Sequence, residues 1–198
     1  MISGAGLRAR IAHAASVLLL ASLPAAAQEE TWDFAQLMAQ LAQVQTSRAR
    51  YSEVRRAAVL QKPLHLSGTL FYERPARIEK RQTLPFREVI SVDGDRLTVE
   101  REGKTREVRL QNAPLVAALV ESLRATLAGD GAELERLYSV RVGGTRQRWT
   151  LALSPREVEI ASVVKGISIS GSGSRVAHLE ILEASGDGSV MTIHEESP

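Results

Sequence analysis

The residue types that commonly carry out catalysis are few and scattered in this sequence. After the N-terminal leader described below, the histidines are His65, His178 and His194, and the chain contains no cysteine. None of the three stands at metal-ligand spacing from another histidine, which argues against a zinc site. His178 alternates with Glu180 along one strand-like stretch, where a surface pair is the simplest interpretation.

Other catalytic patterns are incomplete. A nucleophile elbow needs Gly-x-Ser-x-Gly, and the nearest stretch, residues 166–170, ends in Ser and alternates like a strand. The Gly-Ser run at 171–174 is followed by no helical pattern, so it does not read as a phosphate loop. Asp93 and Asp95 could hold Ca²⁺, but two acids around a glycine are typical of hairpin-turn chemistry. We therefore expect no enzyme, no metal and no cofactor.

The first 27 residues read as a signal peptide. Arg8 and Arg10 precede a short apolar stretch, and "AAAQ" offers small residues for cleavage after Ala27. The apolar stretch is shorter than the roughly 20 residues that a membrane span needs. Export to a bacterial periplasm follows, with residues 28–198 as one domain; a retained N-terminal anchor is the alternative.

Charge and cysteine content narrow the class further. The chain has 25 basic and 23 acidic residues, and removal of Arg8 and Arg10 with the leader leaves 23 of each. A neutral chain lacks the one-signed patch that nucleic-acid binding needs, so no nucleic acid is expected. Without cysteine, packing alone must hold the fold in an oxidising compartment, and the chain is not itself a lipoprotein.

The first half predicts one helix followed by strands. Asp33 and Gln36 resemble a capping box, and apolar residues at helical spacing predict a helix from about Asp33 to Arg50. From Val54 to Leu110 the period changes to two. Asp93-Gly94 predicts a hairpin turn, and Gly103 a second one.

The second half repeats this order. Asn112 is a candidate cap, Pro114 fits a first helical turn, and Gly129 can end the helix. The helix between them is apolar over a wide arc and is expected to bury deeply. Strand-like stretches follow, including "QRWTLALS" and "VEIASVVKGISIS". The expected fold is α+β: one strongly curved antiparallel sheet, an unclosed β-barrel, with two helices on its concave apolar face.

One stretch carries a more specific pattern. "SGTLFYERPARI" places a glycine-led strand, Gly68–Glu73, before an Arg74-Pro75 step and then Ile78. A second strand, Val89–Val92, then ends at the Asp93-Gly94 turn. This stretch resembles the periplasmic outer-membrane lipoprotein carrier family, LolA, and the order of leader, helices and strands is also similar.

The resemblance implies a carrier that shields acyl chains in a hydrophobic cavity covered by helices. It implies that Arg74, before the proline, contacts the lid helix from inside the barrel. An apolar cavity would be lined by residues of the sheet and of the second helix: Leu66, Leu70, Tyr72, Ile78, Ile90, Leu115, Leu119, Leu123, Trp149 and Leu151.

Strand alternation agrees with this placement. Leu66, Leu70, Tyr72 and Arg74 fall on one strand face. If that face points inward, Arg74 is a cation at the rim of an apolar space, and it should seek carbonyls at a helix end. The alternative is a strand-end arginine exposed to water.

The implied partners are an acylated lipoprotein or other lipid cargo, an inner-membrane donor complex and an outer-membrane acceptor, with the protein as a monomer. Aromatic residues make up only 4% of the chain, and the family's C-terminal tail is missing, so a divergent paralogue carrying an aryl-polyene or fatty-acyl lipid is an alternative. An envelope sensor or interaction domain of the same fold, without lipid transport, is another.

Overall fold

The structure, a computed structural model, describes residues 32–195; the expected signal peptide therefore lies outside the described residues. Its elements, in chain order, are α1 (Phe34–Leu41), β1 (Thr46–Arg56), β2 (Leu64–Glu73), β3 (Arg77–Leu84), β4 (Glu88–Asp93), β5 (Arg96–Arg101), β6 (Lys104–Arg109), a 3-10 turn η1 (Leu110–Asn112), α2 (Pro114–Ala128), α3 (Gly131–Leu137), β7 (Tyr138–Thr145), β8 (Arg148–Pro155), α4 (Val158–Ala161), β9 (Val164–Ser172), β10 (Arg175–Glu183) and β11 (Gly188–Glu195).

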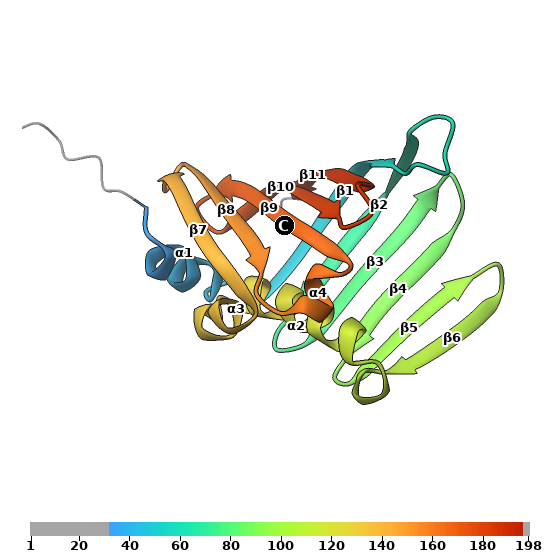
Figure 1. Ribbon diagram of the computed structural model, residues 1–198, viewed down its shortest axis with the longest axis horizontal. Coiled ribbons are helices and arrows are strands. Elements are labelled where there is room, and N and C mark those ends of the chain that lie inside the picture. Colours follow the sequence, from blue (N-terminus) through green and yellow to red (C-terminus); the bar gives the residue numbers. More distant parts are fainter. Residues whose placement is uncertain (1–31, 196–198) are drawn as a thin grey trace, which may run out of the picture.

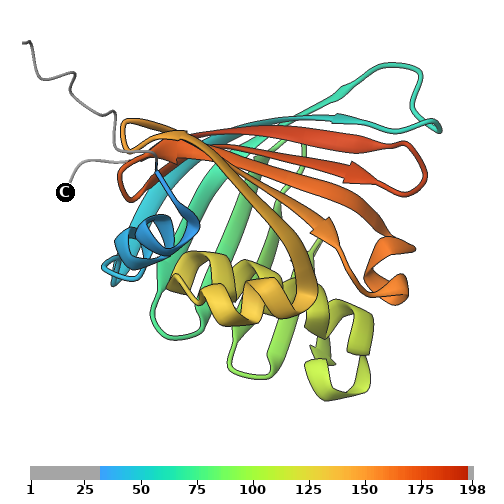
Figure 2. The same ribbon diagram turned by 60° about the vertical axis from the view of Figure 1, so that its left-hand side comes forward.

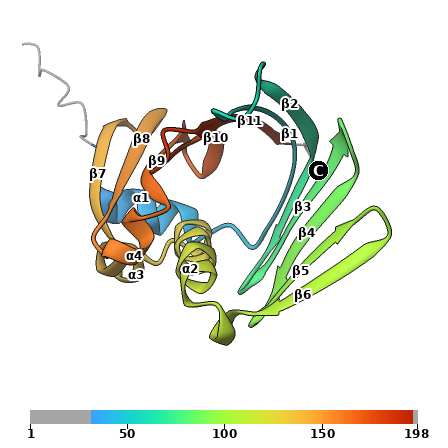
Figure 3. The same ribbon diagram turned by 45° about the vertical axis from the view of Figure 1, so that its right-hand side comes forward.

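All the strands described belong to one antiparallel sheet in the order β6-β5-β4-β3-β2-β1-β11-β10-β9-β8-β7. Each half of the chain forms a meander, and the pairing of β1 with β11 joins the two halves. The sheet curves strongly, and its edge strands β6 and β7 stay apart on either side of α2 (Figures 1 and 3). The expected unclosed β-barrel with helices on its concave face is confirmed.

The expected hairpin turns form where the glycines stand. Gly94 joins β4 to β5 with φ 55°, and Gly103 joins β5 to β6 with φ 72°. Both values lie in the left-handed region that glycine adopts at little cost. The strands around these turns match the stretches expected from alternation.

The helix expected over 33–50 is only partly correct. Asp33 forms the expected capping box with Gln36, but α1 ends at Leu41 and β1 begins at Thr46. Ala49, Tyr51 and Glu53 are buried at alternate positions of β1, which pairs with both β2 and β11. Pairing with β2 on one side and with the distant β11 on the other overrides the local helical pattern.

Three further expectations need correction. Asn112 does not cap α2, because η1 includes it and Ala113 becomes the N-cap without a side-chain bond. "VEIASVVKGISIS" is not one strand: Val158–Ala161 form α4, which buries Ile160, and β9 follows. With α3 and α4, the described residues contain more helices than the two that were expected. The expected C-terminus of α2 is confirmed, since Gly129 closes it with φ 68°.

The main core lies between the helices and the C-terminal half of the sheet. Its buried side chains come from α1, α2, α3, α4 and strands β7–β9: Leu37, Met38, Leu41, Ala125, Leu134, Leu137, Tyr138, Trp149, Leu151, Leu153, Ile160 and Ile169. Helix α2 is less buried than its composition suggests, since Leu123 is 40% exposed. The helices gather at one end of the concave face, and the strands extend beyond them toward the teal β1–β2 loop (Figure 2).

Candidate functional site

An apolar cavity of about 230 Å³ lies between the C-terminal ends of α1 and α2 and the concave face of the sheet. Residues from both helices and from strands β1–β3 and β9–β11 line it, among them Leu41, Val44, Ala49, Leu70, Tyr72, Ile78, Lys80, Leu123, Leu127, Ile169, Val176, Leu179, Met191 and Ile193. The volume is below the range of about 300–1,000 Å³ typical of pockets for drug-sized ligands. A larger apolar cargo would therefore require the helices to move.

The residues expected to line a cavity divide into three groups. Leu70, Tyr72, Ile78 and Leu123 line this cavity, and Arg74 lies at the end of the same strand face.

The remaining expected residues lie outside its wall. Leu66 is buried beside Tyr51 and Met191. Leu119 packs against the main core, and Trp149 and Leu151 are fully buried within that core.

The last two expected residues also lie outside the cavity wall. Leu115 lines a separate depression between α2 and α4. Ile90 is half-buried on β4, directly opposite Lys80 of β3.

Arg74 joins the sheet to both helices that cover the cavity. Its Nη1 donates to the carbonyl of Ala42, the C-cap of α1, at 2.6 Å, and to the carbonyl of Ala128, the last residue of α2, at 3.2 Å. A helix C-terminus carries partial negative charge and unpaired carbonyls, so a guanidinium fits there. The contact spans a partly buried space between elements that are far apart in sequence.

Gly129 explains how two helix ends come within reach of one side chain. A Cβ on this residue would lie 2.2 Å from the carbonyl oxygen of Met38 and 2.6 Å from the amide nitrogen of Ala42. Only glycine allows the α2 C-terminus to approach α1 this closely while also adopting a positive φ. The two carbonyls that Arg74 binds are thereby brought together.

Arg124 also joins α2 to the sheet, but here the donor lies on the helix and the accepting carbonyls lie on the sheet. This contact was not expected from the sequence. From α2, Arg124 Nη2 donates to the carbonyl of Gly94 in the β4–β5 turn and, at 3.5 Å, to that of Ala76 in the β2–β3 turn. Its side chain is only 14% exposed, and its Nε has no partner among the described residues. Arg74 and Arg124 thus hold α2 against the same strands from opposite directions.

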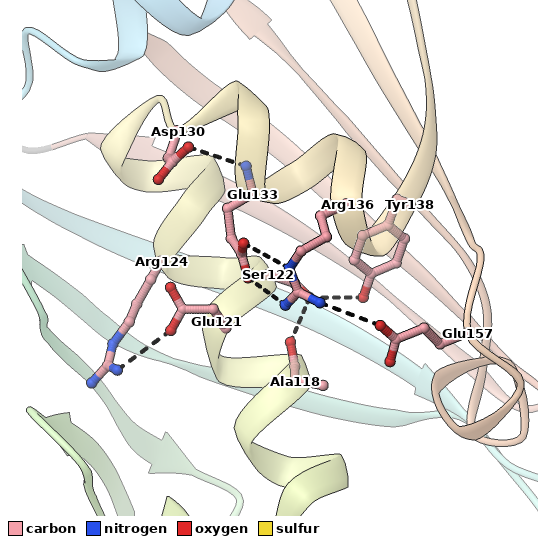
Figure 4. Close-up of polar contacts among 9 residues, drawn as sticks. All are labelled: Ala118, Glu121, Ser122, Arg124, Asp130, Glu133, Arg136, Tyr138 and Glu157. Carbon is pink, nitrogen blue, oxygen red and sulfur yellow. Dashed lines mark hydrogen bonds and ion pairs between the residues drawn. The ribbon is translucent and has the colours of Figure 1, made fainter.

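On its other side α2 is fixed by a polar network at α3 and β7. The Ser122 hydroxyl donates to the carbonyl of Ala118 and hydrogen-bonds with the hydroxyl of the fully buried Tyr138 at 2.9 Å (Figure 4). Arg136 pairs with Glu133 and Glu157 nearby. Arg124 points away from this network, toward the strands of the opposite half (Figure 4).

A buried ion pair lies beside the cavity. Glu53 of β1 is 2% exposed and accepts from Lys80 Nζ of β3 at 2.5 Å, with Arg55 at 3.6 Å from its other oxygen. Lys80 lines the cavity, and its ammonium lies 4.9 Å from the centre of the Tyr51 ring. The sequence analysis missed this pair because charges that alternate along strands usually mark a solvated face. Glu53 shares a strand face with Ala49 and Tyr51, and this was the available signal.

Burial changes the acidity of the tyrosines here. It raises the pKa of Tyr51 to about 12, with the carboxylates of Glu53 and Glu88 adding to the effect. Burial also raises the pKa values of Tyr72 and Tyr138. The hydroxyls of Tyr51 and Tyr72 have no hydrogen-bond partner among the described residues. The cavity wall is therefore an environment that disfavours charge.

Within residues 32–195 no cluster of His, Asp or Glu is arranged to hold a metal ion. No helix in that range has the length and apolar character needed to cross a bilayer.

A family model described as outer membrane lipoprotein carrier protein LolA-like matches residues 25–193. No curated protein matches the chain. Similar solved structures include a LolA superfamily protein from Nitrosomonas europaea, with 12% identity, a TM-score of 0.44 and coverage of 83% of this chain and 93% of that one. An outer membrane lipoprotein-sorting protein domain from Vibrio parahaemolyticus has 8% identity, a TM-score of 0.45 and coverage of 83% and 91%. MucB in the Pseudomonas aeruginosa MucA/MucB complex has 16% identity, a TM-score of 0.39 and coverage of 82% and 56%.

Proposed function

Because the chain belongs to the outer membrane lipoprotein carrier protein LolA-like family, we propose that it is a periplasmic carrier that holds acyl chains of a lipoprotein or related lipid in its cavity. The observation that carries this proposal is the apolar cavity beneath two helix ends that Arg74 ties to the sheet. An apolar chamber with a few placed polar groups is the usual form of a small-molecule binding site.

Arg74 is the proposed latch of the lid, which we define as α1 and α2. In the closed form its guanidinium satisfies two helix-end carbonyls, and cargo larger than the cavity must separate the lid from the sheet. Binding of cargo then competes with these hydrogen bonds. The latch favours the closed, empty form and so promotes release to an acceptor.

The transfer between an inner-membrane donor and an outer-membrane acceptor follows from differences in affinity. The described residues hold no metal cluster, and the proposal needs none. A monomer suffices, because the cavity is formed within one chain.

The test is to isolate the exported protein and analyse its bound lipid by native mass spectrometry. We expect a co-purifying acyl lipid. Replacement of Arg74 by Leu should slow lipid dissociation by about 5–100-fold, because the lost charged hydrogen bonds are worth about 1–3 kcal/mol to the closed form. Arg77→Leu is the matched control, since Arg77 lies three residues away with a side chain 55% exposed.

The results separate the alternatives. A protein free of lipid that also takes up no added acyl lipid would favour an interaction domain over a carrier. An R74L variant that folds but releases lipid at the wild-type rate would remove the latch and leave the carrier role standing.

A further inference from the structure

The concave face of β2–β6 changes from apolar to charged with distance from α2. The strand registers place three cross-strand rows on it. The near row is Tyr72, Ile78, Val92, Leu97 and Val108; the middle row is Leu70, Lys80, Ile90, Val99 and Arg106; the far row is Gly68, Gln82, Glu88, Arg101 and Lys104. The near row packs against α2 through Val120 and Val116. The cavity thus opens onto a polar surface.

Two cations on this surface lack an acidic partner. Arg101 pairs with Glu88 and Glu102 and lies over the Phe86 ring at 4.1 Å. Lys104, directly opposite Arg101, and Arg106, in the middle row, have no ion pair within residues 32–195. Like charges placed directly opposite on paired strands are destabilising, and the same hairpin also places Arg96 opposite Arg109 on its convex face. The two faces therefore differ in their net charge and not in this opposition.

Protection of an exposed sheet edge is the simpler explanation for charges on β6. That role would be served equally by balanced charges. On the convex face of the same hairpin the charges are balanced, since Arg96 and Arg109 share it with Glu100 and Glu107, and Arg96 pairs with Glu107 at 3.3 Å. The excess of positive charge is confined to the concave face, the one continuous with the cavity.

Lys80 connects the cavity with this surface. It lines the cavity and shares the middle row with Arg106, three strands away. At about 4.8 Å per strand the two backbones are roughly 14 Å apart. That distance is close to the depth of about 15 Å that acyl chains occupy in one leaflet of a bilayer. The cavity is lined on this side by no residue beyond β3, so a chain whose head group lies beside Arg106 would keep its far end in the cavity. The rest of the chain would cross Ile90 and Val99 of the middle row.

We propose that the cargo is an acyl lipid with an anionic head group, whose chain occupies the cavity and whose head group is bound by Lys104 and Arg106. The proposal rests on the carrier function and names the substrate class of that same cavity. Lys80, held by Glu53, marks the boundary between the apolar and the charged part of the site.

The experiment measures binding of two probes to the full mature chain by calorimetry. Lysophosphatidylglycerol and lysophosphatidylcholine with the same acyl chain differ only in having an anionic or a zwitterionic head group. The test variant is Lys104→Gln with Arg106→Gln. The control is Arg96→Gln with Arg109→Gln, which removes the same charge from the opposite face of the same hairpin.

We expect wild-type protein to prefer the anionic lipid, with a preference that falls as salt is raised. The test variant should lose roughly five- to tenfold in affinity for the anionic lipid only, as two partly exposed charge contacts allow. The control variant should keep the preference. Inorganic phosphate, added as a competitor, should displace the anionic lipid only weakly.

Four results would overturn the inference. Equal affinity for both lipids would remove the head-group site while leaving the carrier function in place. An equal loss in the control variant would assign the effect to overall charge, and strong competition by inorganic phosphate would indicate a free-anion site. Failure of both lipids to bind would overturn the proposed function and this inference together.

Discussion

The concave face is lined by different kinds of residue in the two halves of the sheet. On the C-terminal half, the row that runs through Met191, Leu179, Ile169, Leu151 and Val142 is apolar throughout. All of it except Met191, which packs with Tyr51 and Leu66, joins the helices in the main core. On the N-terminal half, a much smaller apolar cluster around Val92, Leu110 and Val120 contacts α2, and two arginines supply the other contacts.

This difference indicates which part can move. Large apolar contacts are lost only at high cost, so the lid should stay with strands β7–β9. Hydrogen bonds from Arg74 and Arg124 to carbonyls can be exchanged for water at a cost of a few kcal/mol. The cavity should therefore open by separation of the lid from β2–β5, and the pairing of β1 with β11 allows the sheet to remain whole.

The largest expected effect comes from breaking the packed half. Leu151→Ala should lower the free energy of unfolding by about 3–4 kcal/mol, because Leu151 is fully buried and leaves a cavity. Ile90→Ala, on the half-buried middle row of the other half, should cost about 1 kcal/mol. Urea unfolding followed by circular dichroism measures both, and equal costs would contradict the division into a packed and a releasable half.

The sequence predicted the strands of this fold better than its helices. Alternation and the glycine turns at Gly94 and Gly103 are local signals, and both were sufficient. In residues 42–50 the sequence continues the helical pattern of α1, which led to the wrong helix boundary. Only pairing with β2 and β11 makes Thr46–Arg50 a strand. Helix α3 is too short for periodicity to reveal, although Asp130, whose side chain accepts from Glu133, was a usable cap signal.

The site was predictable where it followed from one strand. The resemblance to the LolA family implied the contact of Arg74 with a helix, and alternation along β2, which puts Arg74 on the face of Leu70 and Tyr72, agreed with it. Alternation alone left a water-exposed arginine as the alternative, and the structure gives Arg74 two helix-end carbonyls as partners. Arg124 could not be found in this way, because its partners are turn carbonyls that only the folded sheet brings near α2. Glu53 and Lys80 were missed because alternating charges usually mark a solvated face, and because their pairing joins β1 to β3 across the intervening β2.

An intermediate effect should come from Arg124. Arg124→Met should lower stability by about 1 kcal/mol, since its carbonyl contacts are lost while the packing of its stem is largely kept. If Arg74 and Arg124 hold the same lid, the double variant should slow lipid dissociation more than the two single effects combined predict. Stopped-flow displacement of a fluorescent fatty acid measures this. Simple additivity would mean that the two arginines act on separate motions.

The smallest expected effects on stability come from two tyrosine substitutions, one at Tyr51 of β1 and one at Tyr138 of β7. Tyr51→Phe should leave stability at neutral pH nearly unchanged, because its hydroxyl has no partner among the described residues. Tyr138→Phe should cost about 1 kcal/mol, because it loses the hydrogen bond with Ser122.

The Tyr51→Phe variant should differ from the wild type at alkaline pH. Unfolded tyrosine ionises near pH 10, whereas the pKa of Tyr51 in the folded protein is about 12. Between these values the unfolded state loses its proton first, so stability is fully present below pH 10 and falls as the pH rises toward 12. Tyr51→Phe should reduce that fall, as measured by urea unfolding at several pH values in this window. If stability falls equally in Tyr51→Phe and in the wild type, Tyr51 lies in a more solvated environment than the structure indicates. The same would then hold for the neighbouring polar end of the cavity, which Glu53 and Lys80 define.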